Sequence, residues 1–203
     1  MKKLACLPLV LGLVLSACGN APGQLFGNRV SVGVAVDDSG STETATKTVT
    51  PATETAPAKV TWTITPGNGV TFTFMTRPGS DAVYLKGYRI LKKTVSTVSG
   101  TTTQENLGDV NKLNLYLTSG YSCAARTALN SCPPQASDTL PANGVPAQYT
   151  LSLEGGLGNL ARATDGNVTQ VTSIEFYGTS SNGQPVTIQA DGIVSQGLRL
   201  GDE

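Results

Sequence analysis

Few residue types in this chain could carry chemistry, and one important type is missing. The 203 residues include no histidine, which excludes Ser-His-Asp and Cys-His triads, zinc sites that need imidazole, and any imidazole general base. The 14 acidic residues are dispersed along the chain. An enzyme would therefore need carboxylates paired by the fold, a Ser-Lys pair or a metal on oxygen ligands. We predict that the protein is not an enzyme and that it holds no cofactor.

Cysteine is the reactive side chain whose positions are informative. The chain has four cysteines: Cys6, Cys18, Cys123 and Cys132. Cys18 follows a leader with two basic residues, Lys2 and Lys3, and a 12-residue apolar run from 4 to 15. This run is too short to cross a bilayer as a helix, which takes about 20 residues. We therefore predict that residues 1–17 are a cleaved export signal.

The end of the leader resembles the lipobox of bacterial lipoproteins. Residues 15–18 read Leu-Ser-Ala-Cys, a branched apolar residue and two small residues before the required cysteine. The resemblance implies that the Cys18 thiol receives a diacylglycerol, that the chain is cut before Cys18, and that fatty acids such as palmitate anchor the protein. Two or three acyl chains hold a protein on a membrane almost irreversibly, because each methylene buried in the bilayer contributes about 0.8 kcal/mol. The alternative is an ordinary secretory signal that ends in a cysteine by chance.

The chain that begins at Cys18 is slightly acidic. Loss of the two leader lysines leaves 12 basic and 14 acidic residues, a formal charge of −2. Such a chain has no cationic field, so we expect no nucleic-acid partner. We expect an exported protein, anchored to the cell membrane or outer membrane and facing the periplasm or the cell surface; Gly19 after the cysteine favours the outer membrane. The expected partners are the lipid bilayer, through acylated Cys18, and an envelope protein or polysaccharide.

Cys123 and Cys132 are the two cysteines left after processing and lipidation. An oxidising compartment and a short intervening loop predict a disulfide between them. Closing a loop of this size contributes about 2 to 3 kcal/mol in the chain-entropy model. A redox-active pair is the alternative, but such pairs usually have a two-residue spacing at a helix N-terminus.

Two polar motifs have both a functional and an ordinary interpretation. Residues 37–40 read Asp-Asp-Ser-Gly and could offer oxygen ligands to calcium, although they lack the alternating carboxylates and final Glu of an EF-hand loop. A polar turn after a strand explains them equally well, and we predict no metal site. Residues 167–169 read Asn-Val-Thr, formally a glycosylation sequon, which we interpret as coincidence beside a bacterial lipobox.

Tyrosines are the other candidate binding residues. Exposed aromatic rings can stack on sugars, and the available tyrosines are Tyr84, Tyr88, Tyr116, Tyr121 and Tyr177. The expected strand phases place Tyr84, Tyr88 and Tyr116 on the polar face of a sheet. Tyrosine is also an ordinary residue on the outer face of a strand. Our principal hypothesis is therefore a non-catalytic binding or structural module of the cell envelope. The alternatives are a surface carbohydrate-binding module and a carboxylate-based hydrolase.

Strands have to position these residues, and alternating apolar residues predict where the strands lie. The predicted strands are 30–36, 60–64, 70–74, 83–91, 113–117, 149–153, and a final hairpin from Ile174 to Ile188. Turn residues at 66–69 predict that the strands on either side of them pair. The Asn-Gly at 182–183 predicts a tight hairpin turn. Helical character is confined to one turn at 158–164.

One segment lacks the side chains that a core needs. From 39 to 55, nine of 17 residues are Ser or Thr and none is large. Because such a segment buries too little surface to offset its ordering entropy, we predict a disordered loop or linker there. Whether it separates the first strand from the main sheet is left open by the sequence.

Together these elements predict an all-β antiparallel sandwich, with a closed barrel as the alternative. Residues 87–89, Gly-Tyr-Arg, and the final hairpin resemble immunoglobulin-like and fibronectin type III modules, which implies a fold of that kind. We expect residues 1–17 to be a lipoprotein signal peptide and 18–28 a flexible tether. Residues 29–58 hold the first strand and the Ser/Thr-rich segment, and 59–203 form the sandwich.

Overall fold

The computed structural model describes residues 29–108, 110–124, 126–127, 130, 132 and 138–201. The predicted leader, Cys18 and the tether at 18–28 lie outside the described residues. The described part of the chain is mostly β-structure, as predicted, with one short helix, α1 (Leu157–Ala163). The strands are β1 (Val32–Asp37), β2 (Thr42–Thr50), β3 (Lys59–Thr65), β4 (Val70–Thr76), β5 (Val83–Thr97), β6 (Gly100–Glu105), β7 (Val110–Leu117), β8 (Tyr121–Ser122), β9 (Leu140–Pro141), β10 (Ala147–Leu151), β11 (Val168–Ser180) and β12 (Pro185–Leu200).

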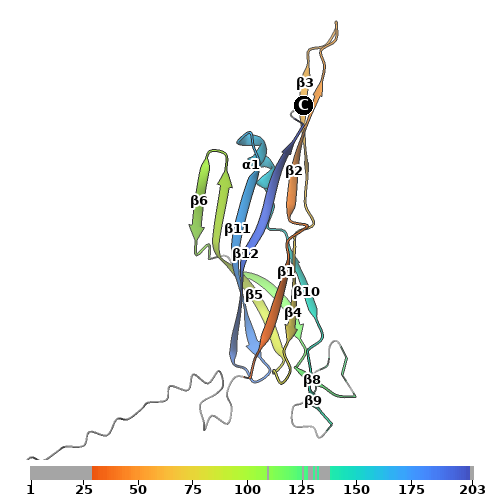
Figure 1. Cartoon of the computed structure of the whole chain (residues 1–203), viewed down its shortest axis with the longest axis vertical. Coiled ribbons are helices and arrows are strands. Elements are labelled where there is room, and N and C mark those ends of the chain that lie inside the picture. The colour runs from red at the N-terminus through yellow and green to blue at the C-terminus, as the bar shows by residue number, and fades with distance from the viewer. Residues whose placement is uncertain are drawn as a thin grey trace, which may run out of the picture.

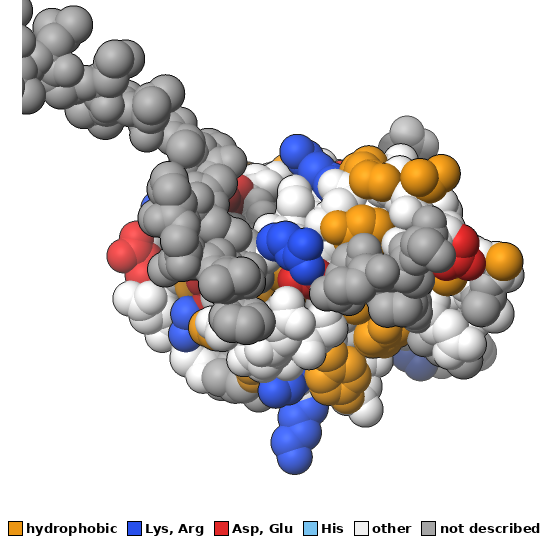
Figure 2. Space-filling view, turned by 90° about the horizontal axis from the view of Figure 1, so that it is seen from below, with side chains coloured by type: hydrophobic (Ala, Val, Ile, Leu, Met, Phe, Trp, Pro, Cys, Tyr) orange, Lys and Arg blue, Asp and Glu red, His pale blue; other side chains and the backbone are white. Residues whose placement is uncertain are grey.

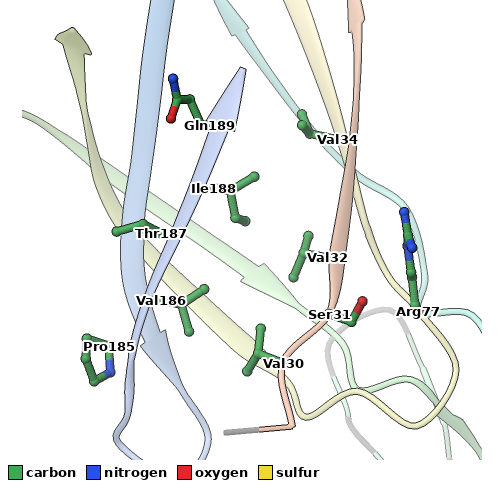
Figure 3. Close-up of a pocket in the computed structure, with 10 residues that line it drawn as sticks. All are labelled: Val30, Ser31, Val32, Val34, Arg77, Pro185, Val186, Thr187, Ile188 and Gln189. Carbon is green, nitrogen blue, oxygen red and sulfur yellow. The ribbon is translucent and has the colours of Figure 1, made fainter. Parts of the chain in front are cut away.

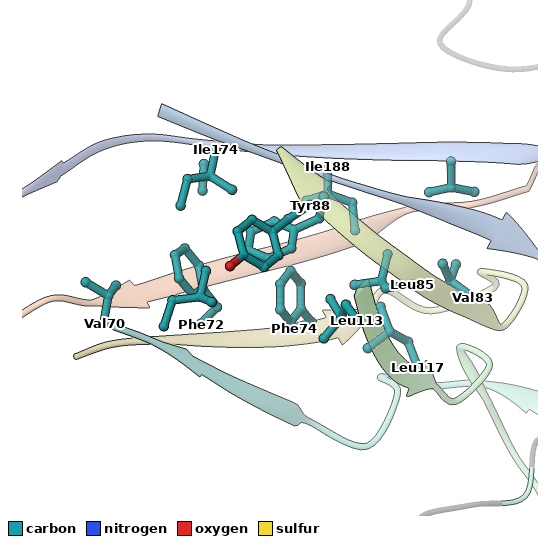
Figure 4. Close-up of a cluster of buried hydrophobic side chains, with 14 of the residues drawn as sticks. Val70, Phe72, Phe74, Val83, Leu85, Tyr88, Leu113, Leu117, Ile174 and Ile188 are labelled. Atoms are coloured by element: carbon teal, nitrogen blue, oxygen red, sulfur yellow. The ribbon is translucent and has the colours of Figure 1, made fainter. Parts of the chain in front are cut away.

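Two sheets pack face to face in the lower half of the molecule (Figure 1). A three-stranded sheet in the order β1-β4-β10 faces the lower parts of β12, β11, β5 and β7, which belong to a seven-stranded sheet. Alternating apolar side chains from both sheets form one core (Figure 4). Phe72 and Phe74 of the small sheet each meet Phe176 of the large sheet edge-on, with ring centroids 4.9 Å apart. These three fully buried rings join the two layers.

The upper half consists of the large sheet and α1. The long strands β5, β11 and β12 continue past the small sheet, where β6 lies beside β5, and β2 and β3 lie beside β12. Leu157 and Ala161 of α1 pack on Val168 and form a second, smaller core. β2 and β3 form a ribbon that extends above the rest of the sheet (Figure 1).

The prediction of a disordered loop or linker from 39 to 55 is wrong for most of that segment. β2 occupies Thr42–Thr50 and has a partner on each side: it runs parallel to β12 and antiparallel to β3. Its β-branched threonines suit an extended backbone, and Glu43 and Ala45 are buried. Hydrogen bonds along two edges, rather than large buried side chains, hold this segment. The parallel pair also makes the sheet mixed, whereas we predicted an antiparallel one.

The strands predicted at 60–64 and 70–74 are present, but the prediction that they pair is wrong. β3 pairs with β2 in the large sheet, and β4 pairs with β1 and β10 in the small sheet. The turn between them therefore carries the chain from one sheet to the other. Its close approach to the turn before β2 requires glycine, because a Cβ on Gly67 would lie 2.6 Å from the carbonyl oxygen of Gly40. The first strand, whose place was open, joins the small sheet through β4.

The final hairpin and the helix are confirmed. β11 and β12 pair antiparallel around a turn in which Gly183 has a φ of 77°, the left-handed conformation that glycine adopts without strain. α1 begins at Leu157 and ends at Ala163, where the sequence predicted one helical turn.

A disulfide and an arginine brace the loop that contains β8 (Tyr121–Ser122), which we call the braced loop. The predicted disulfide between Cys123 and Cys132 is present. Arg126 lies between these cysteines in the sequence, and its guanidinium donates hydrogen bonds across the loop. The acceptors are the carbonyl oxygens of Ser119, Tyr121 and Asn143 and the hydroxyl of Thr118. Arg126 therefore connects the residues around β8 with the segment that follows β9.

Candidate functional site

The side of the molecule where β1 faces β12 is open. β1 is the terminal strand of the small sheet, and β12 pairs with β2 only from Gln196 to Leu200. Within the described residues, no strand pairs with the outer edge of β1 or with the outer edge of β12 from Pro185 to Ala190. The two edges border a groove of about 610 Å³ (Figure 3). We call it the β1–β12 groove.

Apolar side chains on both sides of the β1–β12 groove face one another. Val30, Val32 and Val34 point from the β1 side toward Val186 and Ile188 of β12 (Figure 3). The three valines are half-buried and pack against the main core, to which Val186 and Ile188 belong. Val186 and Ile188 are themselves buried, so the groove runs along one side of the core.

The groove also has polar residues in its lining: Ser31, Arg77, Thr187 and Gln189, of which Arg77 is the one charged residue. The lower end is held in place by backbone contacts: the N–H of Ser31 donates to the hydroxyl of Ser80 at 2.9 Å, and the N–H of Arg77 donates to the carbonyl oxygen of Ser31 at 2.8 Å. Among the described residues, the Arg77 guanidinium forms no ion pair. The groove thus combines apolar and polar residues with a single cationic side chain.

The sequence predicted the valines of this site but missed the groove. Period-2 alternation identified the face that Val30, Val32 and Val34 present to a core. Whether other strands fully cover that face depends on which strands pair, and the residues around the valines do not show this. Arg77 gave a weak signal, because its position before Pro78 suggested only a turn.

Residues 37–40, which we considered as possible calcium ligands, lie at the polar turn that follows β1. The Asp37 carboxylate accepts hydrogen bonds from the hydroxyl and the backbone N–H of Ser39, and these two donors lower the pKa of Asp37. The Asp38 carboxylate accepts the N–H of Val194 at 2.9 Å, so it caps the edge of β12. In the part of the chain that the structure describes, no cluster of three or more Cys, Asp and Glu is placed to hold a metal ion.

Three of the five candidate tyrosines gather on the outer face of the large sheet. Tyr84 of β5 lies directly opposite Tyr116 of β7, and Tyr177 of β11 is two residues from Thr179, the other cross-strand partner of Tyr84. Tyr121 lies elsewhere, in the braced loop, where its hydroxyl donates to the carbonyl oxygen of Gly79 at 3.2 Å.

The expectation that Tyr88 lies on the polar face is wrong. Tyr88 is 9% exposed and belongs to the main core, where its ring centroid lies 5.9 Å from that of Phe176. The register of β5 shifts between Leu85 and Gly87, and an extra residue in a strand reverses the faces of the residues after it. The candidate platform is therefore smaller than predicted.

We expect Tyr88 to make stability fall at alkaline pH. Burial, and secondarily Tyr149, raise the pKa of Tyr88 above its usual value, so the folded state favours the protonated phenol. The contribution of Tyr88 to the free energy of unfolding is fully present below about pH 10, the ordinary pKa of tyrosine. It is lost as the pH rises from there through the folded-state pKa. Urea unfolding at increasing pH should therefore show a shallower alkaline loss for Tyr88→Phe than for the natural protein. An equal flattening in Tyr177→Phe, a half-buried tyrosine on the outer face, would contradict this assignment.

Two buried carboxylates were not singled out from the sequence. Glu43 and Glu154 are 7% and 2% exposed. Glu43 accepts the N–H of Gly158 at 2.6 Å, and Glu154 accepts the hydroxyl of Ser41 at 3.2 Å. Neither glutamate lines the β1–β12 groove or the hollow of about 200 Å³ beside Asp38. Their hydrogen bonds tie β2 to the segment that leads into α1.

Two other motifs were singled out from the sequence, the sequon at Asn167 and the lipobox cysteine. The side-chain oxygen of Asn167 accepts the N–H of Arg199 at 3.0 Å, so the sequon asparagine takes part in the fold. Cys18 lies outside the described residues. The described residues contain no helix that could span a lipid bilayer.

Comparison with known proteins gives no family for this chain. No protein-family model matches it, and no curated protein matches it in sequence. The case for a function therefore depends on the leader sequence and on the geometry of the β1–β12 groove.

Proposed function

We propose that the chain is an exported, lipid-anchored protein of the cell envelope whose folded domain is a non-catalytic binding module. The observation that carries the binding role is the β1–β12 groove, which runs along the core between two strand edges that have no partner strand among the described residues. Anchoring through acylated Cys18 would hold this groove near the membrane, and the tether at 18–28 would let the domain reach a partner.

The chemistry of the groove supports binding rather than catalysis. Its one ionisable side chain is Arg77, and a guanidinium stays protonated at physiological pH, so it does not act as an acid or base there. Valine, isoleucine and threonine side chains supply surface for contact. A concave site that combines apolar side chains with polar groups, and that has no group able to act as an acid or base, is suited to binding.

The anchor is tested by metabolic labelling with a radioactive fatty acid. We expect label in the natural protein and in Cys6→Ser, because Cys6 lies in the predicted leader. We expect no label in Cys18→Ser and release of that variant from the membrane fraction. A labelled, membrane-bound Cys18→Ser protein would overturn the anchor.

The binding role is tested by photo-crosslinking of the full-length protein in its native membranes. A photoreactive residue in place of Thr187, which lines the groove, should yield adducts that the same residue in place of Thr103 does not. Thr103 is exposed on β6, away from the groove. Equal yields at both positions, or none at either, would count against the groove as the binding face.

A second candidate function is carbohydrate binding, favoured by the Tyr84–Tyr116 pair with Tyr177 nearby on the outer face. Retention on a polysaccharide column that is lost in Tyr84→Ala, and kept in Arg77→Ala, would support it.

We also propose a relationship to immunoglobulin-like or fibronectin type III modules. Two sheets packed face to face and the final hairpin support that relationship, whereas the parallel pairing of β2 with β12 is a departure from an antiparallel sandwich.

A further inference from the structure

We propose that the β1–β12 groove binds an extended strand of a partner polypeptide, which pairs with the free edge of β12 and carries an acidic residue near Arg77. This inference rests on the proposed function in one respect, that the groove is the binding face. It goes further by stating the class of partner and the way in which the partner is recognised.

The large sheet has a vacant position beside the lower part of β12. In the upper part, β2 pairs with this same edge of β12 from Gln196 to Leu200. Just below, the turn before β2 covers the edge, because Ser41 accepts the N–H of Gln196 and Asp38 accepts the N–H of Val194. From Pro185 to Ala190 the edge has no partner strand among the described residues. An added strand would occupy the position that β2 occupies higher in the sheet.

From Val186 to Ala190 the free edge lacks the charged side chains that usually prevent strand addition, and Pro185, which cannot donate a backbone hydrogen bond, marks its lower limit. Proteins protect exposed edges with charged side chains, above all lysine, and with bulges or covering loops. Residues 185–190 read Pro-Val-Thr-Ile-Gln-Ala and include no charge, and β1 across the groove has none before Asp37. The six residues span about 20 Å at about 3.4 Å per residue, enough for a bound segment of similar length.

The groove also indicates which side chains such a strand needs. Every second residue of an extended segment points to the same face, and here that face meets Val32, Val34 and Ile188. Branched apolar residues at alternate positions would pack on the half-buried valines of β1. The view from the lower end shows apolar side chains at the surface beside basic ones (Figure 2).

Charge gives the strand an orientation. Arg77 is the charged residue of the lining, and it lies at the lower end through its backbone contact with Ser31. A carboxylate at the corresponding end of the bound strand would pair with its guanidinium, which binds carboxylates in a bidentate manner. We therefore infer an acidic residue at that end of the partner segment.

The test measures amide hydrogen exchange of the full-length protein with a synthetic octapeptide that alternates valine and threonine and ends in glutamate. We expect exchange to slow on the order of tenfold or more at those amides of 186–190 that point away from β11, because they have no partner strand among the described residues before the peptide adds. Exchange in β6, an exposed edge away from the groove, should stay unchanged. The same peptide with an N-methyl group on every residue should give no protection, because neither of its edges can then complete the backbone pairing.

Affinity measured by fluorescence anisotropy tests the charge. Arg77→Glu should weaken binding of the octapeptide about tenfold, since reversal replaces an attraction with a repulsion. Lys86→Glu, an exposed change on β5 away from the groove, should leave the affinity unchanged. Equal losses in both variants would overturn the role of Arg77.

Three results of the exchange experiment would overturn strand addition. They are equal protection of the amides of β6, no protection of the amides at 186–190, and protection by the N-methylated peptide. The peptide experiment and the crosslinking experiment in native membranes can fail independently of each other. Groove-specific crosslinks without protection by the octapeptide would leave the binding module standing and reject the strand. Protection by the octapeptide without groove-specific crosslinks would support the strand and count against the module in its native setting.

Discussion

Replacing Phe176 with alanine is expected to lower the free energy of unfolding by about 3 to 5 kcal/mol, the range measured for phenylalanine truncation in protein cores. Phe176 is fully buried and contacts Phe72 and Phe74 edge-on from the opposite sheet. Alanine would remove both ring contacts and leave a cavity between the layers, which close packing cannot refill without moving a strand. Urea unfolding followed by circular dichroism would measure the loss.

The matched control is Thr179→Ala on the outer face of the same strand. Thr179 pairs with Tyr84 and Pro185 across the sheet but does not belong to the core. We expect it to lose less than about 1 kcal/mol, the range over which side chains on a strand surface differ. Comparable losses in the two variants would mean that the sheets are not joined through Phe176.

A second large effect is expected at Gly178, where alanine should destabilise the protein by about 3 kcal/mol, the upper end of the usual cost of overpacking. A Cβ at Gly178 would overlap the carbonyl oxygen of Tyr84 and lie 2.8 Å from the Cα of Leu85. Both neighbours are backbone atoms of β5 at the register shift beside β11. Neither can rotate away, so one of the strands would have to move.

Gly33→Ala on β1 is the control for the Gly178 substitution. A Cβ on Gly33 would meet its nearest atom, the carbonyl oxygen of Met75, at 3.8 Å, which is ordinary van der Waals contact. Chemical denaturation should show a change within about 0.5 kcal/mol, as for most substitutions that create no strain. If Gly178→Ala were as mild as Gly33→Ala, the close approach of β11 to β5 would be disproved.

The positions of most strands could be predicted from the sequence, because each half-buried strand has an alternating pattern of its own. Val70, Phe72 and Phe74 show this directly: all three alternate and all three are fully buried. β2 could not be predicted in the same way. Its threonines bury little, and its order comes from pairing with β12, a strand about 150 residues later in the chain. A local pattern does not report hydrogen bonds made by a distant partner.

The candidate site was predictable only in part for a related reason. Alternation placed the valines of β1 on an inner face, but the vacancy beside β12 depends on where β2 stops pairing. Tyr88 shows a second limit. The register shift before it moves its ring from the outer face to the core, and nothing in the residues around it distinguishes a bulge from regular pairing.

The parallel pairing of β2 with β12 sets the order in which the molecule can assemble. Ser41 and Ser195, whose hydroxyl oxygens lie 2.6 Å apart at this junction, are separated by 154 residues, and contacts of such long range slow folding. When the chain is made from its amino end, β2 can pair early with β3, the next strand in the sequence, but its other edge has to wait for β12. The upper sheet would then close as one of the last steps.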